Sequence, residues 1–239
     1  MSSLRISAKD LGQLALPNFC ARCFWIKRRL SNKLPFQSFP GIFSSIDSYT
    51  KKVIHGQHDT TGAFPEYLSS LGDLRSYVNP PHYTKFSRTD EKTGVTLWGT
   101  PDAIFMFADE SYLIADYKTA RITNTQDGML PQYQVQLNAY AYIGETSNVT
   151  PVSKLALLYF EPETEESHAI ESGNRMEHGF KMGFGCKIKT VDLNRNQVLD
   201  LLESVRFFDT LPSSPLGREG CKDCENLARL LEVASQQVP

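Results

Sequence analysis

The architecture follows from two neighbouring segments, Val95-Thr-Leu-Trp-Gly-Thr-Pro-Asp-Ala-Ile-Phe-Met-Phe107 and Tyr112-Leu-Ile-Ala-Asp-Tyr-Lys-Thr119. Both are rich in β-branched and aromatic residues, and the polar run Ala108-Asp-Glu-Ser111 between them is typical of a turn. We therefore expect an antiparallel hairpin. Because Pro101 cannot donate a hydrogen bond to a neighbouring strand, a bulge is predicted at Gly99-Thr-Pro-Asp102.

The pairing register of this hairpin brings charged side chains together. With the turn centred near residues 109–110, Asp102 falls opposite residue 116 or 117. Side chains alternate between the two faces of a strand, so Asp116 and Lys118 share one face. Two carboxylates suit Mg²⁺ or Mn²⁺, and a neighbouring lysine can orient water or offset charge on a phosphoryl oxygen. The pattern indicates phosphodiester hydrolysis; the alternative is a surface ion pair between Asp116 and Lys118.

Residues 131–145 are predicted to form a helix with a proline in its first turn. Its polar and apolar residues fall on different faces because residues three and four apart are neighbours on a helix. The polar face carries amides and phenols that can hold a carboxylate or a phosphate: Gln132, Tyr133, Gln136 and Tyr140. The other face carries packing residues: Val135, Leu137, Ala139 and Ile143. Either tyrosine taken alone could instead be a half-buried packing residue with a polar tip.

Three motifs, Gly99-Thr-Pro-Asp102, Asp116-Tyr-Lys118 and Gln136-Leu-Asn-Ala-Tyr140, occur in this order along the chain. Together they resemble the RecB-type branch of the PD-(D/E)XK nuclease superfamily. The resemblance implies that Asp102, Asp116 and the backbone carbonyl of Tyr117 bind a metal ion, and that Lys118 is the catalytic lysine. It also implies that Gln136 and Tyr140 support the site or contact a DNA strand.

Members of that superfamily usually carry an acid or a histidine on a helix upstream of the hairpin. The candidates here are His55, His58 and Asp47. We favour His55 as a further metal ligand, because Val53-Ile-His-Gly56 has the character of a helix end. An ordinary surface or core histidine is the alternative.

Two Cys-x-x-Cys pairs, Cys20/Cys23 and Cys221/Cys224, flank the predicted core. Each pair has the spacing that binds one metal ion, so four thiolates can join the two ends of the chain. The ligands suit Zn²⁺ or an iron–sulfur cluster equally. The resemblance favours a 4Fe–4S cluster, as in AddB and the CRISPR-associated nuclease, although those use one N-terminal and three C-terminal cysteines. Cys186 is expected to be a small buried residue.

The order of predicted elements indicates an α/β fold. Helices over 8–16, 18–30 and 46–55 precede two strands, a helix, strands over 154–160 and 180–192, and a helix over 194–208; a last helix follows Cys224. Residues 31–45 are expected to form an ordered loop. This order implies a mixed sheet flanked by helices. The resemblance implies that this core is restriction-endonuclease-like. We expect residues 1–55 and 209–239 to form a helical, metal-stapled region around a nuclease core of residues 56–208.

Composition and charge bound the choice of partners. The chain has 239 residues, 41% of them apolar, and a net charge of −2. Residues 1–52 carry +7 and the remainder −9, so the N-terminal segment could meet a polyanion, although Lys27–Arg29 could simply be the solvated face of a helix. There is no apolar run long enough to span a membrane and no secretion-type leader, and five cysteines fit a reducing compartment. A cytoplasmic protein is expected.

These features predict an Mg²⁺- or Mn²⁺-dependent deoxyribonuclease. Its substrate is expected to be DNA that is single-stranded or has free ends, in repair, recombination or CRISPR adaptation, with bases stacking on aromatics near Trp98 and Tyr117. The alternative is a non-catalytic nucleic-acid-binding module of a larger repair or adaptation complex. A third reading is a metal-free redox sensor that uses the cysteine pairs.

Overall fold

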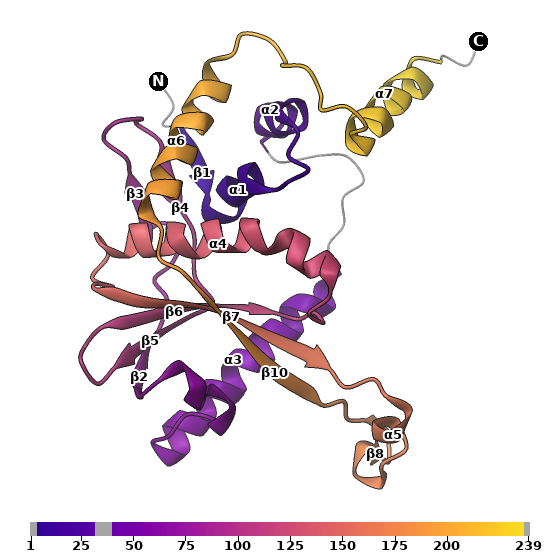
Figure 1. Ribbon diagram of the computed structural model, residues 1–239. Coiled ribbons are helices and arrows are strands. Elements are labelled where there is room, and N and C mark those ends of the chain that lie inside the picture. The colour runs from indigo at the N-terminus through magenta and orange to yellow at the C-terminus, as the bar shows by residue number, and fades with distance from the viewer. Residues whose placement is uncertain (1–3, 32–39, 237–239) are drawn as a thin grey trace.

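A five-stranded mixed sheet lies at the centre of the computed structural model, which describes residues 4–31 and 40–236, apart from the side chains of 124–127 (Figure 1). Its strand order is β10 (Phe184–Val191), β7 (Val152–Pro162), β6 (Tyr112–Lys118), β5 (Ala103–Phe107) and β2 (Leu74–Val78). Strands β6 and β7 are parallel and the other pairs are antiparallel. The parallel pair is joined by α4 (Asn124–Gly144), because parallel neighbours need a crossover connection. The predicted α/β fold with a mixed sheet is confirmed.

Helices cover both faces of this sheet. Helix α4 lies against one face, while α3 (Gly41–Thr61) and the 3₁₀ helix η2 (Glu66–Leu71) cover the other (Figure 1). Period-two alternation along β6 divides its residues accordingly: Ile114 belongs to the core beneath α4, and Leu113 and Ala115 belong to the core beneath α3. Helix α3 is longer than the expected 46–55 helix, and the expected boundary between residues 55 and 56 falls inside it.

A second, three-stranded sheet interrupts the predicted first strand of the hairpin. Strand β4 (Thr96–Trp98) pairs in parallel with β1 (Arg5–Ser7) and antiparallel with β3 (Ser87–Thr89), and only after Gly99–Asp102 does the chain enter β5. The expected irregularity at this segment is therefore a change of sheet. Gly99 is required there, since a Cβ atom would lie 2.5 Å from Cε1 of Tyr140.

The N-terminal and C-terminal helices meet at one end of the molecule. Helix α1 (Ala8–Gly12) is capped by Ser7, whose Oγ accepts a hydrogen bond from the backbone N–H of Asp10; the 3₁₀ turn η1 (Gln13–Ala15) follows. Helix α2 (Ala21–Arg29) packs near α6 (Arg195–Thr210) and α7 (Lys222–Ser235) (Figure 1). Aromatic rings of Phe19, Phe24 and Phe208 hold α2 against α6.

A lobe projects from the sheet between β7 and β10 (Figure 1). It contains α5 (Glu166–Ala169), the 3₁₀ turn η3 (Ser172–Asn174), β8 (Arg175–Met176) and β9 (Gly179–Phe180). The expected strand over 180–192 therefore begins only at Phe184. The expected loop over 31–45 is wrong at its end, because α3 already begins at Gly41; residues 32–39 lie outside the described residues. No described helix has the length and apolar character needed to cross a membrane.

Candidate active site and cysteine centre

The hairpin register places Asp102 and Asp116 side by side. Ala103 pairs with Ala115, so Asp102 falls opposite residue 116, as predicted. The backbone N–H of Tyr117 donates to Oδ2 of Asp102 across 2.8 Å. Since even-numbered residues of β6 face α4, Asp116 and Lys118 share the side of the sheet covered by that helix.

Asp116 is a buried carboxylate with a single cationic neighbour among the described residues. It is 3% exposed, and its Oδ2 forms an ion pair with Nζ of Lys118. Burial raises the pKa of Asp116 to about 7; Lys118 opposes this rise, and the charge of Asp102 adds to it. Burial alone would lower the pKa of Lys118, but Asp116 outweighs burial and raises it. Nζ of Lys118 also lies 4.0 Å from the ring centre of Tyr133, a cation–π contact.

Gln136 on α4 fixes the other oxygen of Asp116. Its Nε2 donates to Oδ1 of Asp116 and to Oη of Tyr140, both across 3.0 Å. Its Oε1 is buried and has no hydrogen-bond partner among the described residues. A buried acceptor without a donor, beside two carboxylates, fits a site whose missing member is a cation or a metal-bound water. Gln132 of the same polar face instead reaches the backbone of Lys9.

Helix α3 brings Asp47, one of the three upstream candidates, to the site together with Lys51, which was not expected there. Nζ of Lys51 lies 3.1 Å from Oδ1 of Asp102 and 3.1 Å from Oδ2 of Asp47. Burial and the charge of Asp102 raise the pKa of Asp47. Three carboxylates and two ammonium groups therefore meet where α3 passes the ends of β5 and β6. The i,i+4 spacing of Asp47 and Lys51 predicts an ion pair along the helix, but it does not indicate that Lys51 also contacts Asp102.

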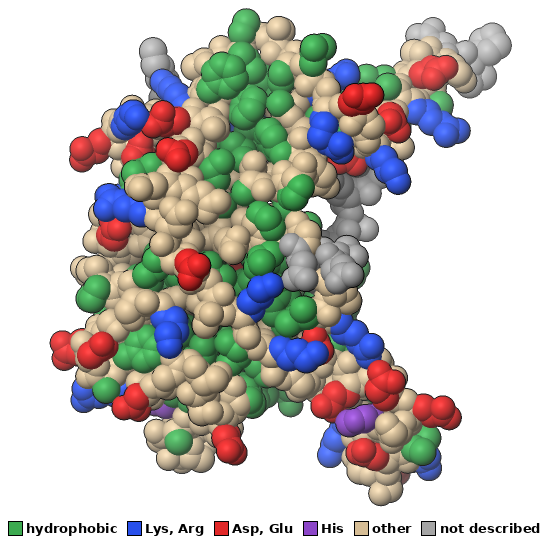
Figure 2. Space-filling model, in the orientation of Figure 1, with side chains coloured by type: hydrophobic (Ala, Val, Ile, Leu, Met, Phe, Trp, Pro, Cys, Tyr) green, Lys and Arg blue, Asp and Glu red, His purple; other side chains and the backbone are tan. Residues whose placement is uncertain are grey.

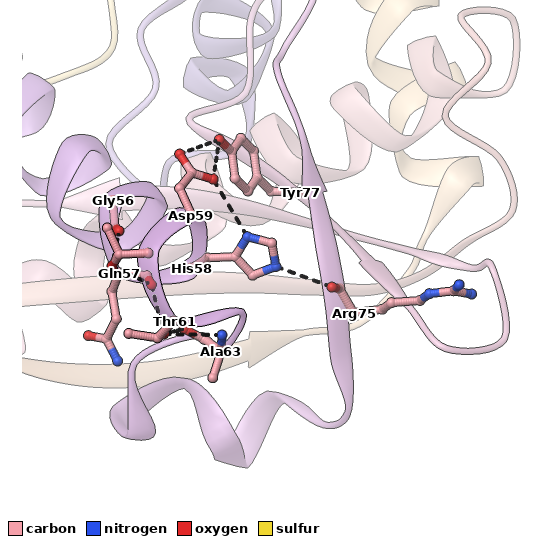
Figure 3. A network of polar contacts seen from close by, with 9 residues as sticks. Gly56, Gln57, His58, Asp59, Thr61, Ala63, Arg75 and Tyr77 are labelled. Atoms are coloured by element: carbon pink, nitrogen blue, oxygen red, sulfur yellow. Dashed lines mark hydrogen bonds and ion pairs between the residues drawn. The ribbon is translucent and has the colours of Figure 1, made fainter.

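The two histidines of α3 are engaged elsewhere. The ring of His55 stacks on Tyr77 with 3.9 Å between centroids, and burial lowers its pKa. Nε2 of His58 lies 3.3 Å from the backbone oxygen of Arg75, and its Nδ1 lies 3.7 Å from Oδ1 of Asp59 (Figure 3). Tyr77 reaches the same carboxylate from β2. Of the three upstream candidates, Asp47 is linked through Lys51 to Asp102, whereas His55 and His58 make the contacts just described.

Tyr117 points away from the carboxylates. It occupies an odd position on β6, is 7% exposed, and packs edge-on against Phe160 in the core beneath α3. Burial holds the pKa of its phenol well above the usual value. The ring of Tyr117 is therefore not exposed for stacking on a base, whereas a role for its backbone carbonyl stays a prediction.

The four paired cysteines converge as predicted. Their Sγ atoms all lie within 4.8 Å of one another, with Cys20–Cys224 at 3.5 Å, Cys23–Cys221 at 3.6 Å and Cys23–Cys224 at 3.4 Å. A tetrahedral ion with Zn–S bonds of about 2.3 Å separates its sulfurs by about 3.8 Å. The group can thus hold a metal. An iron–sulfur cluster places four iron atoms between the thiolates and would need them farther apart.

Backbone contacts tune one of these thiols. Burial raises the pKa of Cys20, but hydrogen bonds from the backbone of Arg218 and Cys23 outweigh it and lower that pKa to about 6. The thiolate is the form that ligates metal, so a lowered pKa favours ligation by Cys20. Cys186 lies on β10, away from this group, and burial raises its pKa to about 11.

Several basic residues of the N-terminal segment form contacts within the protein. Lys27 pairs with Asp10 across 3.0 Å, while Arg28 and Arg29 donate to backbone oxygens of Arg5 and Asp209. Figure 2 shows basic and acidic side chains interspersed over one face of the molecule. On that face there is no continuous basic patch, so the charge excess of residues 1–52 does not by itself define a DNA-binding surface.

Comparison with known proteins agrees with this geometry. The family model of the PD-(D/E)XK nuclease superfamily matches residues 44–229, which is most of the chain. The protein therefore belongs to the PD-(D/E)XK nuclease superfamily. No curated protein matches it. Among solved structures, the one described as the crystal structure of SSO0001 is similar over 90% of this chain and 89% of that chain, with 12% sequence identity and a TM-score of 0.38.

Proposed function

We propose that this protein is an Mg²⁺- or Mn²⁺-dependent deoxyribonuclease that acts on DNA with single-stranded regions or free ends. The observation that carries the proposal is the convergence of Asp102 and Asp116 with the ammonium of Lys118. Superfamily membership supports phosphodiester hydrolysis of a nucleic acid. An exonucleolytic mode and a place in repair, recombination or CRISPR adaptation are the finer parts of this proposal.

Each residue of the site has a separate task. Asp102 and Asp116 would hold the divalent ion, with the backbone carbonyl of Tyr117 as a further ligand. The ion, when bound, supplies a Lewis acid for the phosphate and an acidified water. Lys118 holds its proton beside Asp116 and can donate hydrogen bonds to water or to a phosphoryl oxygen. Gln136 fixes the orientation of Asp116, and Tyr140 accepts a hydrogen bond from Gln136.

For the upstream ligand we propose Asp47. It shares Lys51 with Asp102, whereas His55 stacks on Tyr77. Asp47→Asn is then expected to weaken Mn²⁺ binding more than His55→Gln does. Titration of the protein with Mn²⁺, followed by electron paramagnetic resonance, measures both variants. A larger loss of Mn²⁺ affinity in His55→Gln would instead assign His55 as the upstream ligand.

A resident metal centre at the four cysteines is the second part of the proposal. The resemblance of the nuclease motifs favours a 4Fe–4S cluster, although the cysteine pattern differs, while the present sulfur separations suit a single Zn²⁺. Accommodating the cluster requires the two pairs to move apart. Anaerobically purified protein is expected to be brown, with an absorbance band at about 400 nm. A colourless, zinc-loaded sample would assign Zn²⁺ instead.

The deciding experiment is cleavage of end-labelled single-stranded and duplex DNA. Asp116→Asn and Lys118→Met are each expected to reduce the rate with Mg²⁺ or Mn²⁺ by at least about 100-fold. Asp109→Asn is the matched control, because Asp109 is an exposed aspartate in the turn of the same hairpin. Full activity in either site variant contradicts the assigned roles. DNA binding without cutting on any substrate would favour a non-catalytic module.

A further inference from the structure

Two aromatic side chains border the segment that leads to Asp102. Trp98 is the last residue of β4, directly before the Gly99–Asp102 connection. Its ring centre lies 5.4 Å from that of Tyr83, and the ring of His82 lies 4.2 Å from Tyr83 on the other side. Tyr83 is 45% exposed. The rings thus form a contiguous aromatic surface and are not part of the buried core.

The backbone keeps this surface close to the proposed metal site. Trp98 and Asp102 are four positions apart in the chain, a span of at most about 14 Å even when fully extended. Tyr83 approaches from the other side: β2 ends at Val78, which pairs with Ile104, two residues beyond Asp102. Trp98 therefore lies just before the carboxylate in the chain, and Tyr83 lies in the connection that leaves β2 beside it.

Strand alternation explains why Trp98 faces outward. Leu97 is fully buried in the core beneath the small sheet, so Trp98 must project from its opposite side. Its cross-strand neighbours there are the small residues Ser7 and Ser87, which leave the indole uncovered by larger side chains of those strands. An aromatic ring in this position packs against little of its own sheet.

The loop that carries Tyr83 is stiff. Pro80 and Pro81 restrict the backbone directly before His82, and Nδ1 of His82 lies 2.9 Å from Oγ1 of Thr84. Lys85, also exposed, follows in the same loop. A rigid aromatic surface loses little conformational entropy when a flat ligand stacks on it, and a nearby ammonium favours a ligand that carries phosphates.

We propose that Tyr83 and Trp98 form a platform on which one base of the bound DNA strand stacks, close to the phosphate that would bind the divalent ion held by Asp102 and Asp116. This inference rests on the proposed nuclease function. A base can stack on a protein ring only when it is not enclosed in a duplex, so the platform selects single-stranded DNA or frayed ends. Because each base has a π-face, the selection is independent of sequence.

Fluorescence of Trp98 tests the platform without cleavage. The chain has two tryptophans, and Trp25→Phe leaves Trp98 as the sole indole. With divalent metal withheld, oligothymidylate is expected to quench the emission of this protein. Tyr83→Ala, introduced into the same background, is expected to weaken single-strand affinity about 5- to 100-fold, while Tyr83→Phe retains it. Duplex affinity should be the same in all three proteins.

Phe180→Ala is the matched control. Phe180 is 76% exposed, but it lies on β9 in the projecting lobe and not on the small sheet that carries Trp98. The Phe180→Ala substitution should therefore leave single-strand affinity unchanged. With Mn²⁺ present, Tyr83→Ala should raise KM for single strands and leave kcat intact. If the emission is not quenched, or if Tyr83→Ala binds single strands as tightly as the wild type, the proposed stacking platform is wrong. In that case, cleavage by the unmodified protein would still support the nuclease function. Quenching without any cleavage by the unmodified protein overturns the nuclease instead.

Discussion

Lys51 on α3 and Asp102 at the start of β5 form an ion pair across 3.1 Å, and the same ammonium lies 3.1 Å from Asp47. Helix α3 therefore adds an acid and an ammonium to the two carboxylates of the hairpin. Lys51 neutralises part of the charge that a divalent ion would otherwise neutralise. The ammonium and the metal are thus expected to compete for the same oxygens.

Lys51→Met tests this competition. Without metal, the variant should unfold at a lower temperature than the wild type, because the facing carboxylates lose their shared counter-charge. With Mn²⁺ it should gain more thermal stability, because the stabilisation that a ligand gives to the folded state grows with the logarithm of its affinity. Differential scanning fluorimetry measures both changes. Lys52→Met is the control, since Lys52 is the exposed neighbour on the same helix. Equal metal-dependent gains in the wild type and Lys51→Met would refute the competition.

Gln136→Ala should loosen the orientation of Asp116. Groups that orient metal ligands typically contribute about 10- to 100-fold to metal affinity or activity. We expect a loss of this size in Mn²⁺ affinity, measured by calorimetric titration. Gln132→Ala is matched to it in chemistry, helix and burial, but Gln132 contacts the backbone of Lys9. A comparable loss of affinity in both variants would mean that damage to α4, and not the contact with Asp116, is responsible.

Gly99→Ala should displace Tyr140. The added methyl group would lie 2.5 Å from Cε1 of Tyr140, so the ring must move together with the hydroxyl that accepts from Gln136. Overpacking of this kind costs about 1–3 kcal/mol of unfolding free energy. Urea unfolding measures the loss, and Gly56→Ala, where nothing lies within 4 Å, should show none. Replacement of Tyr140 by Leu in the Gly99→Ala protein should recover stability; if it does not, the clash is not the cause.

Acid should weaken the link between the small sheet and α4. Burial alone would raise the pKa of Asp90, but hydrogen bonds from Thr93 and Tyr142 outweigh it and lower that pKa. The carboxylate therefore contributes stability above its unfolded-state pKa of about 3.9, and this contribution is lost as the pH falls through the folded-state pKa. Asp90→Asn should be less stable than the wild type at pH 7, with the difference narrowing in acid.

Urea unfolding midpoints between neutral and strongly acidic pH measure the effect of Asp90. Asp73→Asn removes the same charge from an exposed position before β2 and serves as the control. A difference between wild type and Asp90→Asn that stays constant across the pH range would contradict the assignment.

The hairpin and its acids could be predicted because their signals are local. Alternation along β6 fixes which residues share a face, and a short turn fixes the register, so Asp102 and Asp116 follow from the sequence. Helical spacing likewise placed Gln136 and Tyr140 together. The same alternation could have excluded Tyr117 as a stacking ring, because its side chain must face away from Asp116.

Long-range features left weaker signals. Strands β1, β3 and β4 have three residues each, and so short a segment shows no clear alternation of polar and apolar residues. In addition, β1 pairs with a strand some ninety positions later in the chain. The partner of Lys51 is 51 positions away and on another element, so no local pattern identifies it. Cysteine spacing was the exception, since Cys-x-x-Cys pairs mark a common ligand whatever separates them. The expected division at residues 55–56 stays a prediction.

The joining of Cys23 to Cys221, which lie 198 positions apart, has a consequence for how the molecule is made. During synthesis the first pair of thiolates leaves the ribosome long before the second and offers an incoming ion half of its ligands. Insertion of any metal that the four cysteines hold would therefore wait until the nuclease core between them has been translated. A ribosome that stalls within the core releases a polypeptide with exposed, reactive sulfur and no means of completing the centre.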